Sequence, residues 1–190
     1  AKLCHRNFGI GGDGVIFALK PPSDDYDFSM RIYNSDGSEP EMCGNGIRFF
    51  AQFLKDIGAD SESYQVDPLA GRIIPVMNAD GTITVDMGEP VLVGPKVPTT
   101  LEPNFEGDSV VEQTLECNGK TWKVSAVSMG NPHAITFVDD LENDIDFERD
   151  GPALESSEVF PAGINVEFVQ VMSDTHLKMK VWERGAGPTL

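Results

Sequence analysis

The sequence predicts an α+β fold made of two related lobes, and three observations carry this prediction. Short segments that alternate apolar and polar side chains, as half-buried strands do, recur along the whole chain of 190 residues. One segment, Asn45 to Ile57, instead repeats apolar residues at helical spacing. The strand-like pattern of residues 28–33 recurs at residues 177–182, which indicates an internal repeat.

The predicted strands are short and run along the whole chain. They cover residues 15–19, 28–33, 72–76, 82–87, 120–126, 133–137, 167–172 and 178–182. The predicted helix ends at Gly58, which supplies a C-terminal cap.

A stretch rich in glycine and proline, residues 88–103, interrupts the strand pattern and is typical of a crossing between domains. We therefore place the lobe boundary near Pro90. Residues 1–90 form the N-terminal lobe, and residues 91–190 form a C-terminal lobe that we expect to be incomplete.

One thiol, Cys43, stands at the predicted start of the helix. A strand at residues 30–33 breaks into the turn formers of residues 34–38, and the sequence Cys43-Gly44-Asn45-Gly46 follows. Unpaired backbone N–H groups and the positive end of the helix dipole stabilise a thiolate at such a position, and the glycines let a substrate approach the backbone. Cys43 is therefore a candidate base, and the alternative is a small residue that fills a pocket.

The internal repeat predicts a second thiol. Leu177-Lys178-Met179-Lys180-Val181-Trp182 matches Phe28-Ser29-Met30-Arg31-Ile32-Tyr33 in residue character, and a glycine-bearing turn follows each. Cys43 comes thirteen positions after Met30, and the same interval after Met179 reaches position 192. We expect a cysteine there in the natural protein, so residues 1–190 alone should not catalyse a reaction that needs two thiols.

Several motifs, in order along nearly the whole chain, resemble the diaminopimelate epimerase family. They are Arg6 with Phe8-Gly9-Ile10-Gly11 and Asp13-Gly14, Asn34 with Asp36-Gly37-Ser38, Met42-Cys43-Gly44-Asn45-Gly46 with Arg48, Val85-Asp86-Met87-Gly88, Ser128-Met129-Gly130-Asn131-Pro132-His133, Asn165-Val166-Glu167-Phe168 and Trp182-Glu183-Arg184-Gly185-Ala186-Gly187. The resemblance implies two pseudo-symmetric lobes, each a strongly bent, mostly antiparallel sheet wrapped around a central helix. The family also continues the last motif into Ala-Cys-Gly-Thr-Gly, which places a cysteine at position 192.

The resemblance implies an epimerase that interconverts LL- and meso-2,6-diaminopimelate for lysine and, in bacteria, peptidoglycan precursors. Inverting an α-carbon requires removal of a proton on one face and return of a proton on the other, which two thiols on opposite faces can do. No pyridoxal cofactor is expected, because the family works without one and no Schiff-base lysine motif is recognisable. Helix N-termini would hold the substrate carboxylate.

The resemblance also assigns residues. The implied catalytic residues are Cys43, His133 and Glu183, with the last two as helpers near the thiols. The implied substrate contacts are Asn34, Gly44, Asn45, Asn131, Asn165, Glu183 and Arg184. Considered without the family, each of these polar residues has a plainer interpretation as a turn former, a strand-end histidine or a surface ion pair. Gly14 departs from the family, since some members carry a polar, substrate-contacting side chain there.

Composition narrows the remaining possibilities. The formal charge of −17 argues against nucleic acid or an anionic membrane as a partner. The three cysteines lack paired spacing, which indicates reduced thiols in the cytoplasm, or in the plastid stroma of a plant-like host. No apolar run reaches membrane-spanning length. We expect a homodimer that binds a small amino acid.

Two other kinds of site are not expected. The Gly9–Gly14 segment fits G-x-G-x-x-G, but it precedes a strand rather than opening a helix, so we interpret it as a turn and not as a dinucleotide site. The histidines are scattered, and the acidic residues 139–150 fit no EF-hand spacing. We therefore predict no metal site and interpret residues 139–150 as a solvated loop.

Two alternatives to the epimerase stay open. One is a related two-thiol racemase or isomerase, such as a proline racemase relative, although Cys-Gly-Asn-Gly with Arg48 and Gly-Asn-Pro-His point away from it. The other is a protein that binds an amino acid without converting it. Exchange of the substrate's α-proton with solvent would separate these possibilities.

Overall fold

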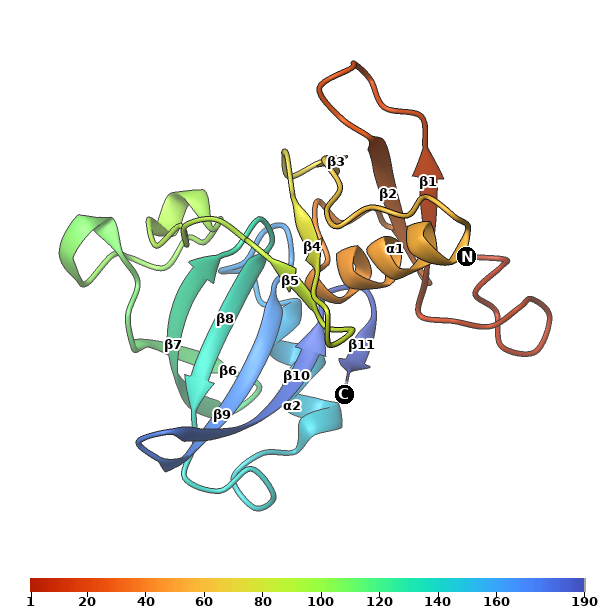
Figure 1. The fold of residues 1–190 in the computed structure, drawn as a ribbon. Helices are drawn as coiled ribbons and strands as arrows, with labels where there is room; N and C mark the ends of the chain where they lie inside the picture. The colour runs from red at the N-terminus through yellow and green to blue at the C-terminus, as the bar shows by residue number, and fades with distance from the viewer. Residues whose placement is uncertain (190) are drawn as a thin grey trace. The chain divides into compact units, whose positions relative to one another are not determined.

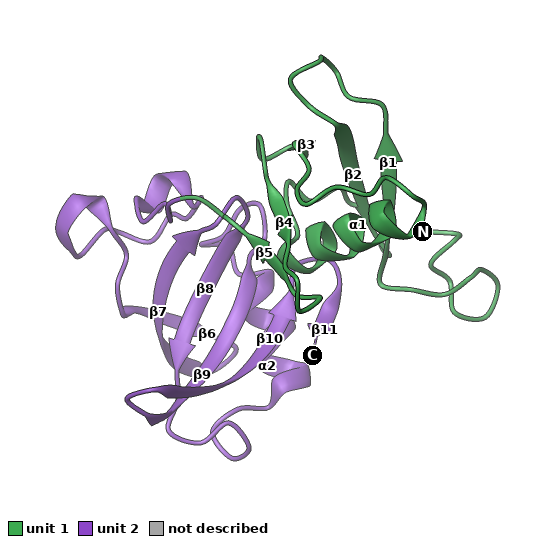
Figure 2. Ribbon diagram, viewed as in Figure 1, with its two compact units in different colours: residues 1–88 green, residues 89–190 purple. Residues whose placement is uncertain are grey.

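The computed structural model describes residues 1–189 and divides the chain into two compact units, Ala1–Gly88 and Glu89–Leu190 (Figure 2). Strands dominate both units, and each contains one α-helix of two or more turns. The chain is therefore mixed α and β, as the sequence predicts.

Unit 1 packs one helix beside short strands (Figure 1). Its elements are β1 (Gly14–Leu19), β2 (Phe28–Asn34), α1 (Gly44–Asp56), β3 (Val66–Asp67), β4 (Pro75–Met77) and β5 (Ile83–Val85). The order in the first sheet is β1-β2-β3, with β2 parallel to β3, while β4 and β5 form an antiparallel pair. The buried face of α1 presents Ile47, Phe50 and Leu54 to this unit's core.

Both ends of α1 follow from local residue chemistry. Cys43 is the N-cap residue in an extended conformation. At the other end Gly58 adopts φ +89°, which favours glycine, and donates to the Lys55 carbonyl at 3.0 Å. The Ala59 amide donates to the Leu54 carbonyl at 3.0 Å, which completes a Schellman cap. The predicted helix, its N-terminal cysteine and its terminal glycine are thus confirmed.

Unit 2 is built on a six-stranded sheet. Its elements are the 3₁₀ turns η1 (Gly94–Lys96) and η2 (Glu106–Asp108), β6 (Gln113–Cys117), β7 (Lys120–Ser128), β8 (Pro132–Phe137), α2 (Phe147–Glu155), β9 (Asn165–Ser173), β10 (His176–Glu183) and β11 (Gly187–Thr189). The strand order is β11-β10-β9-β8-β7-β6, and the only parallel pair in it is β8 with β9. Alternate residues of β9, Val166 and Phe168, enter the core, so Asn165 and Glu167 lie on the opposite face.

Several strands of the structure differ from the predicted ones. The predicted strand at residues 72–76 is split, because Ile73 bridges Val66 while β4 begins only at Pro75 and pairs with β5. Sequence reasoning missed β3 and β11, which have two and three residues, and β6, whose composition is largely polar. Very short or polar strands carry too weak an alternation to be recognised.

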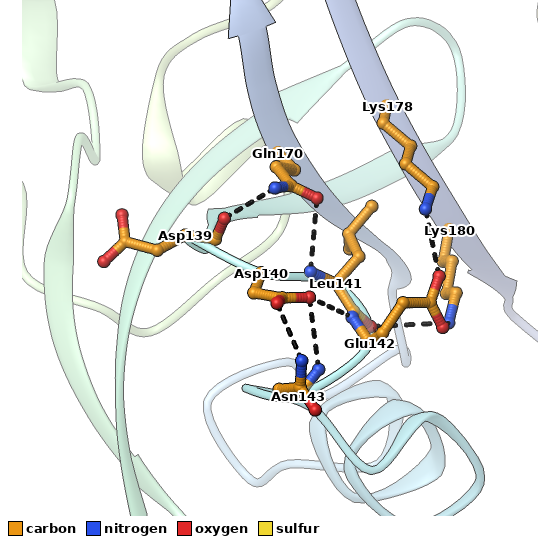
Figure 3. Close-up of polar contacts among 8 residues, drawn as sticks. All are labelled: Asp139, Asp140, Leu141, Glu142, Asn143, Gln170, Lys178 and Lys180. Atoms are coloured by element: carbon orange, nitrogen blue, oxygen red, sulfur yellow. Dashed lines mark hydrogen bonds and ion pairs between the residues drawn. The ribbon is translucent and has the colours of Figure 1, made fainter.

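The prediction of a solvated loop at residues 139–150 is confirmed for residues 139–146, where most carboxylates are exposed, and is wrong for residues 147–150, which belong to α2. The first part is an ordered turn, in which Asp140 accepts hydrogen bonds from the Glu142 amide at 2.8 Å and the Asn143 side chain at 2.8 Å (Figure 3). Glu142 pairs with Lys178 at 3.0 Å and Lys180 at 2.8 Å, both on β10. These hydrogen bonds from Lys180 and Lys178 lower the pKa of Glu142.

The second part of the same acidic run belongs to α2. Asp150 is 1% exposed and pairs with Lys120 at 2.7 Å and Arg149 at 2.8 Å. Gly151 and Pro152 within α2 argue against a helix in the sequence. The structure accounts for the glycine, since a Cβ there would lie 2.8 Å from the Trp182 ring that packs on the helix.

Candidate active site

In unit 1 the thiol of Cys43 is held at the first turn of α1. The residue is half-buried, and its Sγ accepts a hydrogen bond from the Gly46 amide at 3.3 Å. The first hydrogen bond inside the helix, from the Ile47 amide to the Cys43 carbonyl, measures 2.9 Å. Amides before that point have no acceptor within the helix, so this end can stabilise a thiolate or an anionic substrate group.

Gly46 makes room for that thiol. A Cβ at this position would lie 3.2 Å from Cys43 Cβ, 3.3 Å from Cys43 Sγ and 3.3 Å from the Cδ1 of Ile16. A side chain here would therefore press on the sulfur from one side and on β1 from the other. Sequence reasoning assigned this glycine to substrate approach, and the structure adds a packing reason for it.

The other predicted contacts of unit 1 lie at the ends of its elements. Gly44 and Asn45 are exposed in the first turn of α1, and the Asn45 side chain accepts a hydrogen bond from Arg48. Asn34 ends β2, where its side chain donates to Ser38 Oγ at 3.1 Å. Hydrogen bonds from Ser38 lower the pKa of Asp36 in the same turn.

In unit 2 the side chains of Asn131, His133 and Glu167 form a chain of hydrogen bonds. Nδ1 of His133 lies 2.6 Å from Glu167 Oε1, and Nε2 of His133 lies 2.9 Å from Asn131 Oδ1. The parallel register pairs His133 with Asn165 and Ile135 with Glu167, so the carboxylate lies two residue pairs along the strands from the imidazole. Both ring nitrogens of His133 are thus engaged inside the unit.

Asn165 joins two neighbouring segments of the same unit. It is 5% exposed, donates from Nδ2 to the Pro132 carbonyl at 2.8 Å, and accepts at Oδ1 from the Arg184 amide at 2.9 Å. Sequence reasoning treated Asn165 as a substrate contact or a turn former. The structure shows that both ends of its amide tie β8 and the end of β10 together.

Glu183 and Arg184 lie where β10 ends and a turn leads to β11. Glu155 of α2 fastens this turn, since its carboxylate accepts from Trp182 Nε1 at 2.8 Å and from the Gly185 amide at 2.9 Å. Arg184 donates from Nη1 to the Ala162 carbonyl at 3.3 Å.

Sequence reasoning proposed no role for Glu155 or Glu167. The motif Asn165-Val166-Glu167 does contain the signal for Glu167, because residues two apart on a strand share a face. No comparable signal exists for Glu155, whose partners are separated from it by about thirty residues.

A metal site, a membrane-spanning helix and a dinucleotide site each place a requirement on the residues that the structure describes. Within residues 1–189, no three histidine, cysteine, aspartate or glutamate side chains are grouped so that they could hold a metal ion. In the same range no helix has the length and apolar character needed to cross a membrane. Gly9, Gly11 and Gly12 precede β1 and Gly14 begins it, so the glycines lead into a strand and not into the helix that a dinucleotide site needs.

Comparison with known proteins gives a consistent result along the chain. A sequence model of the family described as diaminopimelate epimerase matches residues 1–93 and 125–190. A protein of Acaryochloris marina named diaminopimelate epimerase is 60% identical over 194 residues, which cover 100% of this chain and 67% of that protein. A chloroplastic diaminopimelate epimerase of Oryza sativa subsp. japonica is 52% identical over 202 residues, covering 100% of this chain and 55% of the rice protein.

Solved structures resemble the fold at low identity. A hydroxyproline epimerase from Agrobacterium vitis gives a TM-score of 0.69 at 13% identity, over 94% of this chain and 56% of that one. A phenazine biosynthesis protein of the PhzF family from Bacillus anthracis gives 0.54 at 18% identity, over 94% of this chain and 61% of that one. These likenesses concern the fold alone, and they confirm the predicted two-lobed α+β class.

Proposed function

Because this chain belongs to the diaminopimelate epimerase family, we propose that the protein interconverts LL- and meso-2,6-diaminopimelate by proton transfer between two thiols, without a cofactor. The chain spans 67% of the Acaryochloris relative and 55% of the rice relative. The proposal therefore concerns the protein that contains these residues.

The observation that carries this proposal is the position of Cys43. Its sulfur caps α1 and accepts the Gly46 amide, so a negative charge on sulfur has a donor and the positive end of the helix dipole beside it. A thiolate in this position can take the α-proton of an amino acid. A carboxylate of the same substrate can bind the first amides of the helix, where Gly44 and Asn45 lie.

Inversion needs a second acid on the opposite face of the α-carbon. The repeated strand pattern predicts that thiol at position 192, where it would return a proton as Cys43 removes one. The two thiols exchange roles when the reaction runs backwards. Negative charge that develops at the α-carbon and its carboxylate would be stabilised by the helix amides rather than by an electron-withdrawing cofactor.

Other side chains that the resemblance assigns are chemically suited to the rest of the substrate. Arg184 offers a bidentate fork for a carboxylate, and Asn131 and Asn165 offer amides that can meet ammonium or carboxylate groups. The resemblance implies that Asn34 also contacts the substrate. His133 and Glu183 would assist proton transfer at the thiols, as the resemblance implies.

The proposal is tested with the complete protein in deuterium oxide. We expect deuterium to enter the α-carbon of diaminopimelate, and LL and meso isomers to interconvert, while proline exchanges no faster than without protein. Exchange with proline would favour the related racemase. Binding of diaminopimelate without exchange would favour a non-catalytic relative. Sequencing the gene beyond the codon for Leu190 tests the mechanism, since a residue other than cysteine at position 192 would exclude a two-thiol reaction.

The related racemase is kept as a second candidate because proteins with a proline-type substrate share this fold. The assembly is proposed to be a homodimer, which light scattering of the complete protein would test. The compartment is proposed to be the cytoplasm or the plastid stroma, and the chloroplastic name of the rice relative supports the latter for a plant-like host.

A further inference from the structure

Glu167 is a buried carboxylate that has no part in the chemistry described so far. It is 8% exposed. Among residues 1–189, its Oε2 is the only buried side-chain nitrogen or oxygen atom without a hydrogen-bond partner. A buried carboxylate with one unsatisfied oxygen is costly, and such groups persist where a positive partner or a functional role offsets the cost.

The partner of Glu167 is His133, and the hydrogen-bond chain fixes where the protons lie. Asn131 Oδ1 can only accept, so His133 Nε2, 2.9 Å away, must carry a proton. At the other nitrogen, a further proton lies between Nδ1 and Glu167 Oε1 across 2.6 Å, whichever of the two groups holds it. Because Glu167 can share the proton at Nδ1, Nε2 can carry a proton of its own and donate to Asn131.

That proton arrangement orients Asn131. Because Oδ1 of Asn131 faces the imidazole, the other end of the same amide is Nδ2, which carries two donors. Without Glu167, a neutral His133 could keep its one proton on Nδ1 and accept at Nε2. The Asn131 amide would then rotate so that its Nδ2 donates to His133 Nε2. Its oxygen, which repels a carboxylate, would face the substrate in place of the N–H donors.

We propose that Glu167 is a positioning residue that acts through His133 to hold Asn131 with its N–H donors toward a carboxylate of the substrate. This inference rests on the proposed function. The strands make the arrangement rigid, since Glu167 and Asn165 lie on one face of β9 and His133 on the paired face of β8.

The first experiment is a double-mutant cycle in the complete protein, with the KM for diaminopimelate as readout. Glu167→Leu fills the buried site with an apolar side chain of similar size. It should raise KM about tenfold, which is the effect of losing a hydrogen bond to a charged group. It should change kcat to a smaller extent. Combined with Asn131→Ala, it should raise KM no further, because its effect runs through Asn131.

Two further variants separate positioning from structure. Glu167→Gln can donate its amide to Nδ1 and leave Nε2 protonated, so its KM should stay close to that of the wild type. Asp150→Asn removes a different buried carboxylate of the same unit and should lower the melting temperature without moving KM. Additive effects of Glu167→Leu and Asn131→Ala, or an unchanged KM in Glu167→Leu, would overturn the inference.

The second experiment needs no variant to fold. Nitrogen-15 NMR of the histidines in the wild-type protein should show a protonated Nε2 on His133 at neutral pH, and an unprotonated Nε2 would overturn the inference. The two proposals fail separately. A wild-type protein that does not epimerise diaminopimelate overturns the proposed function, whereas an active wild type with additive variants overturns only the role of Glu167.

Discussion

The start of α1 and the paired ends of β8 and β9 place reactive groups in opposite ways. At α1 the consecutive residues 43–46 form the site, and the Gly46 amide donates to the sulfur of Cys43. On the sheet, His133 meets a residue 34 positions away, and its ring is held at both nitrogens. A substitution at a local site of the first kind can abolish activity without lowering the stability of the protein. A substitution in a cluster assembled by strand register should lower both activity and stability.

The sharpest test of the local site is Cys43→Ser. Serine is a better N-cap than cysteine, so the Gly46 amide keeps its acceptor and thermal stability should not fall. The hydroxyl is far too weak an acid to act as the base, so kcat should drop about a thousandfold, within the range for loss of a general base. Deuterium incorporation into diaminopimelate and thermal unfolding measure the two effects.

The control for this variant is Cys117→Ser. Burial and, to a smaller extent, Asp150 raise the pKa of Cys117, and its thiol donates to the Ala153 carbonyl. It should therefore be chemically inert, and its serine variant should keep full activity. A Cys43→Ser protein that still interconverts the LL and meso isomers at the wild-type rate would contradict the assignment of the base.

Asp150 has no part in the proposed chemistry. It therefore tests whether an ion pair between residues distant in the sequence, here with Lys120, contributes to stability. Burial raises its pKa, but hydrogen bonds from Arg149 and Lys120 outweigh burial, so the pKa is lowered. Asp150→Asn should cost about 3 kcal/mol, the lower end for breaking a buried pair, because Lys120 and Arg149 still reach water. Urea unfolding at neutral pH measures this cost.

The same residue predicts a pH dependence. A carboxyl whose pKa is lower in the folded protein contributes its full stability above the ordinary value of 3.8, and loses it as the pH falls below that value. Stability of the wild type should therefore approach that of Asp150→Asn in acid. If the difference between the two proteins stayed constant from pH 7 to pH 3, the ion pair would not be its source.

Asn165 tests the claim that the sheet cluster couples chemistry to stability. Asn165→Ala leaves the Pro132 carbonyl and the Arg184 amide without their partner, which should cost about 2 kcal/mol. Substrate binding should weaken as well, since the end of β10 loses its tie. Chemical denaturation and KM are the two readouts.

A matched asparagine in unit 1 provides the control. Asn78 bonds the hydroxyls of Thr82 and Thr84 in an exposed turn, where water can replace it, so Asn78→Ala should change stability little. If Asn165→Ala lowered activity but left stability unchanged, the contrast between the two regions would not hold.

The contrast also explains what the sequence could predict. The position of Cys43 and the cap at Gly58 follow from neighbouring residues, and both predictions are confirmed. The pairing of His133 with Glu167 depends on the parallel register of β8 and β9, which residue patterns do not encode. The helix α2 was missed for a related reason, because the Trp182 ring that makes Gly151 useful lies on a distant strand.

The smallest expected effect concerns Gly46 and tests how tightly the local site is built. Alanine here gains up to about 1 kcal/mol in helix propensity but must push aside Cys43 Sγ and Ile16, so the net change in stability should be within about 1 kcal/mol. Displacing the sulfur by a few tenths of an ångström should still lower kcat about tenfold, since proton transfer depends on exact placement. The rate of alkylation of Cys43 should change in parallel.

Gly44→Ala, whose Cβ meets no atom within 4 Å, serves as the stability control and should melt higher than the wild type. If Gly46→Ala kept full kcat, the thiol would tolerate more movement than its close contact with Gly46 indicates, and the local site would be looser than the sheet cluster.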